Sequence, residues 1–426
     1  LYADDPEFYR KRLLALGLTH YRSDGSRAHS ATSTTQLSLG VDRVIGSHWI
    51  LSGRWLMARS PEARNPGALT REELATSRDA AAPNNVLRGA DKSVTQHQVG
   101  VTATNVDHRG NRFEATVFGL LRDLVNPLAT APPGPAGPTI GTWSAIDRVA
   151  GGARLSHQRA LDDHGTRLSL GADLQSMRDD RVNRRSDGGA PTADLVASQR
   201  ETVTEIGPWV SLQLEPADRV TVTGSARYDH LGFRVRDQLL DDGDQGGARS
   251  MGAASGSVGA SYALTGSAAI YGTVATAFET PTTTELVNQA DGTVGLNRAL
   301  GPQRTLSTEL GLRTTGPVEV TVAVYRSAVR DALIQAREQD GRAYFENAGR
   351  LTIRGIEAGI AWRPAPSLQL QGSWSRTNAR FSHYLIRNGA AVDTLDGREV
   401  PGTPRHLFRG IATVTVGPVV AEWDQQ

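Results

Sequence analysis

Arginine is the residue type whose number and position in this sequence could serve a binding chemistry. The chain has 46 Lys and Arg residues, of which only Lys11 and Lys92 are lysines, so almost every cationic side chain is a guanidinium. A guanidinium holds the oxygens of a carboxylate or phosphate through two parallel hydrogen bonds, which suits an anionic ligand. The candidate ligand-binding residues, which include two amides of a large polar connection, are Arg54, Arg122, Arg178, Arg181, Arg184, Arg185, Asn288, Gln289 and Arg298.

The four arginines between positions 178 and 185 form the densest group, in a long polar connection that we expect at residues 179–198. Two other interpretations of this group stay open. Asp179, Asp180 and Asp187 lie among the arginines and would neutralise them. Arginines at a membrane surface also pair with lipid phosphates, so the same charges would serve lipid contact rather than ligand capture.

Other chemistries find no support in the residue pattern. The ten His residues show neither the i, i+4 nor the H-x-H spacing of metal sites, and the chain has no Cys. No glycine-rich phosphate loop, G-x-S-x-G or H-E-x-x-H motif occurs. The 46 cations and 45 anions balance, which argues against a nucleic-acid surface. We therefore expect no catalytic residue, no metal ligand, no cofactor and no nucleic-acid partner.

The elements that must position the arginines are strands with a period of two. Val318–Val324 has Val at every second position, and Ser367–Ser375 alternates Leu and Trp with Gln and Ser. No stretch approaches the roughly 18 apolar residues of a membrane-spanning helix. One apolar and one polar face on segments of about 10–14 residues predict an antiparallel transmembrane β-barrel, with lipid outside and water inside. We expect interface-anchoring aromatic residues on the lipid side at Trp49, Trp55, Tyr262 and Trp374.

The connections between these strands alternate between two kinds, as in an up-and-down barrel with one quiet rim and one functional rim. The short ones, rich in Asp, Gly and Pro, are expected at 107–111, 161–165, 215–218, 265–266, 316–317, 363–366 and 417–418. The long polar ones are expected at 60–93, 125–141, 179–198, 235–250, 279–303 and 383–403. About 17 strands result. Thr70 and Glu73 form a capping-box pattern, which predicts one helix in the first long connection.

Five segments in the second half of the chain resemble, in order, the motifs of TonB-dependent outer-membrane receptors. They are Ile270–Leu286 (IYGTVATAFETPTTTEL), Gly301–Leu312 (GPQRTLSTELGL), Val324–Leu333 (VYRSAVRDAL), Phe345–Glu357 (FENAGRLTIRGIE) and Val400–His406 (VPGTPRH). Gln303 and Arg304 replace the common Glu and Thr of the second motif. Asn65–Leu74 and Arg227–Phe233 resemble earlier family segments more loosely, the former especially in receptors for ferric citrate and ferric siderophores.

The resemblance implies a barrel of about 22 strands around a plug. In that alignment the first strand here is the third and the chain stops inside the nineteenth. Residues 1–426 are then expected to be a partial barrel domain without the plug. The implied location is the outer membrane of a Gram-negative bacterium, as a monomer among outer-membrane lipid and lipopolysaccharide. The implied function is import of a scarce ligand, first of all a ferric siderophore or ferric citrate, energised through TonB, which would contact the plug.

Three alternatives remain open: a passive porin, an importer for cobalamin or oligosaccharide, and an outer-membrane hydrolase. A hydrolase would need a Ser/His pair at one height on adjacent strands, and Ser, His and Asp are plentiful in any polar lumen. Two mid-strand carboxylates, Glu309 and Glu357, face the lumen by parity. We expect them to pair with a lumen arginine such as Arg227 rather than to contact a plug or a substrate.

Overall fold

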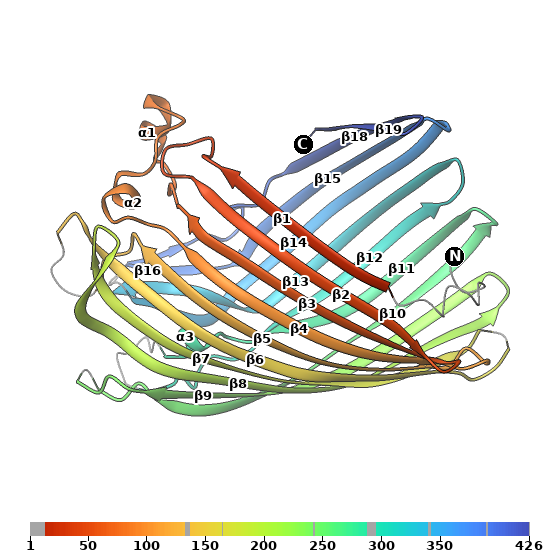
Figure 1. Cartoon of the computed structure of the whole chain (residues 1–426), viewed down its shortest axis with the longest axis horizontal. Helices are drawn as coiled ribbons and strands as arrows, with labels where there is room; N and C mark the ends of the chain where they lie inside the picture. Colours follow the sequence, from red (N-terminus) through yellow and green to blue (C-terminus); the bar gives the residue numbers. More distant parts are fainter. Residues whose placement is uncertain are drawn as a thin grey trace.

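The computed structural model describes residues 13–132, 137–163, 165–241, 243–287, 295–339, 342–388 and 391–425. They form one strongly curved antiparallel sheet of 17 strands and a separate two-stranded hairpin. Each strand of the large sheet pairs with the strands before and after it in the chain, except that β15 pairs with β18 across the small hairpin. Figure 1 shows this sheet wrapped as a barrel wall, with the three helices at one end of the strands.

The strands of the first half are β1 Leu13–Ser23, β2 Thr32–Ile45, β3 Trp49–Ala63, β4 Ser93–Val106, β5 Arg112–Leu128, β6 Ile140–Ala160, β7 Arg167–Asp187, β8 Ala190–Ala217, β9 Val220–Asp237 and β10 Gly247–Thr265. Those of the second half are β11 Ala268–Glu279, β12 Gln303–Thr314, β13 Val318–Gln339, β14 Arg342–Ala365, β15 Leu368–His383, β16 Leu385–Asn388, β17 Ala391–Thr394, β18 His406–Val416 and β19 Val419–Gln425. The helices are α1 Arg71–Thr76, α2 Pro83–Leu87 and α3 Thr283–Val287.

The predicted alternation of an apolar and a polar face is confirmed in the lower part of the wall, where the strands lie next to the short turns. Val318, Val322 and Val324 are exposed on the outer face of β13. Tyr325, on the other face, bonds through its hydroxyl to Thr377 across the lumen side of the sheet. An exposed apolar belt on the outer face is what a membrane barrel presents to the surrounding lipid. Among the described residues, no helix is both long and apolar enough to cross a membrane.

The predicted placement of the short turns at one end and the other connections at the opposite end is confirmed by the order of the strands, because successive connections of an antiparallel meander lie at opposite ends. The turn at 107–111 is held by Asp107, whose carboxylate accepts hydrogen bonds from the backbone N–H groups of Arg109 and Asn111. The predicted capping box is also present: Thr70 and Glu73 bond reciprocally at the start of α1. Helices α2 and α3 were not predicted from the sequence.

The long connection expected at residues 179–198 is wrong. β7 and β8 run through this segment as one tall hairpin and turn at Gly188 and Gly189, whose φ angles are 54° and 90°. Two consecutive glycines with positive φ allow this tight two-residue turn. The connections expected at 125–141 and 235–250 are also shorter than predicted. Strand lengths run from 4 to 28 residues instead of about 10–14, because many strands continue beyond the apolar belt.

The polarity of the two faces reverses in this upper part of the wall, on the side of the long connections. On β9 the inner-face side chains of Phe233 and Val235 are buried, while Arg234 and Arg236 on the outer face are exposed. On β15 the inner-face Phe381 is buried between the exposed Arg380 and Ser382. Side chains continue to alternate between the two faces through this region. The reversal of polarity therefore marks the height at which lipid ends on the outside and packed side chains begin on the inside.

A charge placed on the two faces of β13 tests the orientation of the wall. Val322→Arg should lower the free energy of unfolding by about 2–4 kcal/mol, because it exposes a guanidinium to the hydrocarbon region. Thr321→Arg is the matched control, since its side chain enters the aqueous lumen, and it should cost far less. The measurement is urea titration of full-length protein in lipid vesicles. Equal losses for the two variants would contradict the assignment of faces.

Candidate functional site: the inward-folded loop and the lumen charges

The described parts of the connection from β11 to β12, residues 280–287 and 295–302, fold against the inner face of the barrel. Leu286, Leu296 and Leu300 are buried, with 0%, 7% and 1% of their surface exposed. They pack in one apolar cluster with Phe233 and Met251 of the wall. Each buried Leu removes enough apolar surface from water to contribute roughly 1.5–3 kcal/mol. The reversed polarity of the upper wall therefore has a direct use, because it gives this loop an apolar surface on which to pack.

Local hydrogen bonds shape the loop before it packs. The Glu285 carboxylate accepts a hydrogen bond of 2.7 Å from the Thr282 backbone N–H, and the Thr282 hydroxyl accepts one of 3.3 Å from the Glu285 N–H. This reciprocal pair is a capping box at the start of α3. The Asn297 N–H donates to the Leu286 carbonyl at 2.6 Å and brings the two sides of the loop together.

Asn347 of β14 holds the end of the same loop. Its side-chain amide donates to the carbonyls of Gly301 and Asp331, and its side-chain oxygen accepts from the Gly301 N–H. The Arg249 guanidinium donates to the Asn297 carbonyl at 2.7 Å. Several residues that carried the family resemblance thus have a structural role that the sequence did not reveal: they keep the loop inside the barrel.

A row of charged side chains crosses the inner wall at the height of this loop. In the strand register Arg122 faces Arg148, Arg148 faces Asp179, and Asp179 faces Glu201. Arg148 holds Asp179 through two hydrogen bonds of 2.7 and 2.6 Å, and the Asp179 side chain is 1% exposed. Removal of one member of such a buried pair typically costs about 3–5 kcal/mol, because it leaves an uncompensated charge.

Glu201 links this row to the loop. Its carboxylate accepts a hydrogen bond of 2.7 Å from Arg181 and another of 2.7 Å from Gln199. The hydroxyl of Thr283, in α3, donates to the same carboxylate. One buried carboxylate therefore joins β7, β8 and the loop, and it fixes the loop in place by polar contacts in addition to apolar ones.

The arginines predicted at 178–185 do not form one site, because they alternate along a continuous strand. Arg181 faces the lumen, where Glu201 neutralises it. Arg178 lies on the outer face, 3.6 Å from Asp180. Arg184 and Arg185 lie near the tip of the hairpin, where Arg184 donates to the Ala193 carbonyl at 3.1 Å. The aspartates that the sequence offered as neutralising partners thus do pair with arginines here, Asp180 with Arg178 and Asp179 with Arg148.

Arg122 is a predicted site residue that lies in the lumen, and it forms no ion pair with any carboxylate among the described residues. Its Nε is buried and has no hydrogen-bond partner in the part of the chain that the structure describes. It stands opposite Arg148, whose charge Asp179 neutralises. Three strand spacings of about 4.8 Å separate the backbone at Arg122 from that at Glu201, so Arg122 lies about 14 Å along the wall from the loop contact.

The other predicted site residues lie apart from Arg122. Arg54 also faces the lumen, but near the short-turn end, and it pairs with Asp42 at 2.7 Å. Arg298 is exposed on the loop and close enough to Arg249 for the two positive charges to repel each other. Asn288 and Gln289 lie outside the described residues.

The predicted pairing of Glu309 with Arg227 is wrong. Glu309 accepts a hydrogen bond of 2.8 Å from the Tyr271 hydroxyl. Arg227 instead joins a second lumen network with Asp173 and Asp229, the latter at 2.6 Å. The register of β9 places Arg227 beside these carboxylates, and a sequence without register does not reveal such neighbours. Among the described residues, no three His, Asp or Glu side chains gather in a way that could hold a metal ion.

Comparison with known proteins identifies the protein family whose barrel this chain matches. A family model described as "TonB dependent receptor-like, beta-barrel" matches residues 17–425. This is almost the whole chain, and it includes the loop, the charge row and both networks.

Solved structures with a similar fold include the ferric yersiniabactin uptake receptor FyuA of Yersinia pestis, at 15% identity and a TM-score of 0.71, over 95% of this chain and 60% of that one. The ferric citrate transporter FecA, in its unliganded form, matches at 15% identity and a TM-score of 0.75, over 96% and 59%. The copper transporter OprC matches at 18% identity and 0.74, over 97% and 62%. The chain thus spans about 60% of the length of these proteins.

Truncation of the central loop side chain tests the packing. Leu286→Ala should remove about 2–5 kcal/mol of local stability, so that amide hydrogen exchange at Asn297 becomes faster by about 30-fold or more. Leu240→Ala is the control, because Leu240 lies in another long connection and is 61% exposed. Hydrogen exchange with mass spectrometry gives the result. Unchanged protection of the loop in Leu286→Ala would show that it is not held by this contact.

Proposed function

This chain belongs to the TonB-dependent receptor β-barrel family, and from that premise we propose that it forms the wall of an importer for an anionic metal chelate, first of all a ferric siderophore or ferric citrate. The barrels of this family lie in the outer membrane of Gram-negative bacteria, and its members are receptors and transporters. In this role the barrel binds the ligand and lets it pass, without covalent chemistry.

The observation that carries the proposal is the buried Nε of Arg122 in the lumen, which has no hydrogen-bond partner among the described residues. A buried guanidinium nitrogen without a partner costs free energy, and an anionic ligand would supply the missing acceptor. Arg298 and Arg249 offer two further positive charges at the inward-folded loop. Carboxylate and catecholate oxygens of an iron chelate carry the complementary charge.

The similar proteins support the ligand class by their names alone. FyuA is named for ferric yersiniabactin and FecA for ferric citrate, whereas OprC is named for copper. We propose a ferric chelate for this chain, because a chelate with several anionic oxygens fits Arg122 better than a bare cation would. We also propose that the full protein acts as a monomer and that TonB energises import through a plug.

Replacement of Arg122 tests the proposal in the full-length protein. Arg122→Ala should weaken binding of the cognate ferric chelate by about 1.5–3 kcal/mol, or roughly 10–150-fold in Kd. Arg54→Ala is the matched control, since Arg54 faces the same lumen but pairs with Asp42, and its Kd should stay within about threefold of wild type. Calorimetric titration with ferric citrate, ferric siderophores, cobalamin, copper and an oligosaccharide measures both.

Two outcomes would contradict the proposal. Binding of only a neutral oligosaccharide, unchanged in Arg122→Ala, would overturn the anionic ligand. Uptake of the radiolabelled chelate by cells should stop when a protonophore collapses the inner-membrane proton gradient. Uptake that continues at full rate would instead indicate a passive porin.

A further inference from the structure

The outer face of the wall carries a group of arginines directly above the apolar belt, on β12 to β15. We define the outer arginine patch as Arg304, Arg326, Arg330, Arg354 and Arg376. All five are exposed. Each occupies the same alternate positions as the apolar residues below it, so its side chain leaves the sheet on the lipid side. On β13, for example, Val318 to Val324 precede Arg326 and Arg330 at steps of two.

Two pairs of these arginines face each other in the strand register. Arg326 of β13 stands opposite Arg354 of β14, and Arg304 of β12 stands opposite Arg330 of β13. Like charges in directly opposite positions destabilise a sheet. Within the described ranges, no carboxylate lies within ion-pair distance of any of these four side chains. The arginines of the patch therefore repel one another, and a bound external anion would reduce this repulsion.

A neighbouring arginine shows the contrast. Arg380 of β15 pairs with Glu399 at 3.1 Å, and Glu399 also receives two hydrogen bonds from Arg405. The hydrogen bonds from Arg405 hold the pKa of Glu399 below its ordinary value, so this carboxylate is charged at neutral pH. Arg380 is thereby neutralised. Arg354 and Arg376 share a surface hollow of about 580 Å³ with it, and neither forms an ion pair with a carboxylate of the described chain.

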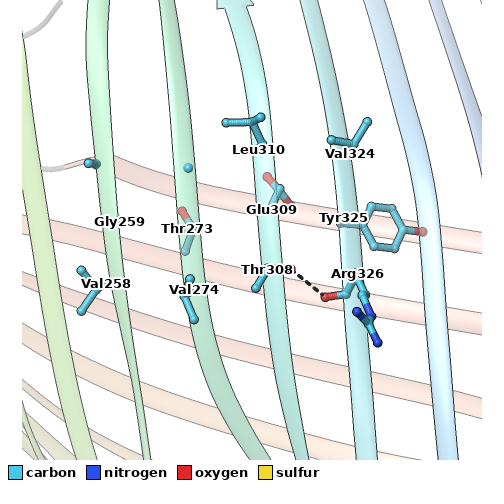
Figure 2. A pocket seen from close by; sticks show the side chains of 12 residues that line it. Val258, Gly259, Thr273, Val274, Thr308, Glu309, Leu310, Val324, Tyr325 and Arg326 are labelled. Carbon is cyan, nitrogen blue, oxygen red and sulfur yellow. Dashed lines mark hydrogen bonds between the residues drawn. The ribbon is translucent and has the colours of Figure 1, made fainter.

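The position of the patch restricts the kind of anion. Directly below it Trp374 stacks on His406, with ring centroids 6.0 Å apart, at the place where aromatic residues mark the membrane interface. A second hollow, of about 550 Å³, lies beside the patch, and its lining includes the outward side chains of Val258, Val274, Leu310 and Arg326. Figure 2 shows Val324 and Arg326 on either side of Tyr325 along β13, so the apolar belt ends and the charge begins within one step of two residues.

We propose that the outer arginine patch binds the phosphate groups of lipopolysaccharide in the outer leaflet, with an acyl chain along the neighbouring apolar hollow. Guanidinium groups hold phosphate oxygens bidentately, and two facing arginines can share one phosphate. A soluble anion would use the charges but not the apolar hollow. The inference rests on the outer-membrane location of the barrel and not on which ligand it imports, so either proposal can fail without the other.

The test measures lipid binding by the full-length protein purified in detergent. Wild type is titrated with lipopolysaccharide, with lipopolysaccharide whose lipid phosphates have been removed, and with inorganic phosphate. The double variant Arg326→Ala/Arg354→Ala should bind intact lipopolysaccharide at least about tenfold more weakly than wild type. The matched control is Arg178→Ala/Arg200→Ala, which removes two outer-face arginines that already lie beside Asp180, and it should stay within about twofold.

A second variant separates binding from folding. Arg326→Lys/Arg354→Lys keeps both charges but loses bidentate geometry, so its affinity should fall between those of wild type and the alanine variant. All variants should keep the heat-resistant gel migration of a folded barrel. Equal binding of intact and dephosphorylated lipid, equal binding by the alanine variant and wild type, or saturation of the patch by inorganic phosphate as tight as by lipid would each overturn the proposal.

Discussion

Hydrogen bonding of the backbone inside a membrane is the constraint on which the rest of this structure depends. Hydrocarbon offers no partner for an N–H or C=O group, so each strand must pair along its whole membrane-spanning length. The ladder from β1 to β19 meets this demand by pairing strands in chain order. Among the described residues, β1 and β19 each pair on one side only. A fixed ladder forces side chains to alternate, so each residue's face follows from its register and not from its neighbours in sequence.

The surroundings of each face then decide which side chains it carries. In the lower wall the outside is lipid and the lumen is polar, whereas in the upper wall the outer face is charged and the inner face is apolar. The inner face accepts the folded loop through Leu286 and Glu201, and the outer face carries Arg326 and Arg354. Both sites follow from the same change: the side chains keep alternating between the two faces, while the polarity of each face reverses with height. The inner site serves the proposed ligand, and the outer site serves the proposed lipid contact.

The sequence alone was enough to predict the features that depend on a local pattern of residues. The alternation of Val318–Val324, the turn at Asp107 and the capping box at Thr70 follow from residue type and spacing. It was not enough to predict features that depend on the register between neighbouring strands. The segment 179–198 has the composition of a loop because both of its faces lie above the lipid, yet it forms a hairpin. The partners of Arg227, and the absence of a described hydrogen-bond partner for Arg122 Nε, depend on which residues face each other across strands. This register cannot be predicted from a single sequence.

The reversal of polarity is most directly tested by labelling single cysteines along β13, which is simplified because these 426 residues contain no Cys. Cysteines replace residues 320 to 330 one at a time in full-length protein on intact cells. The account predicts that Val322→Cys and Val324→Cys react only with a lipid-soluble thiol reagent. Arg326→Cys and Arg330→Cys should react with a membrane-impermeant reagent from outside. Reaction of Val322→Cys with the impermeant reagent, or protection of Arg326→Cys from it, would contradict the boundary between lipid and charge.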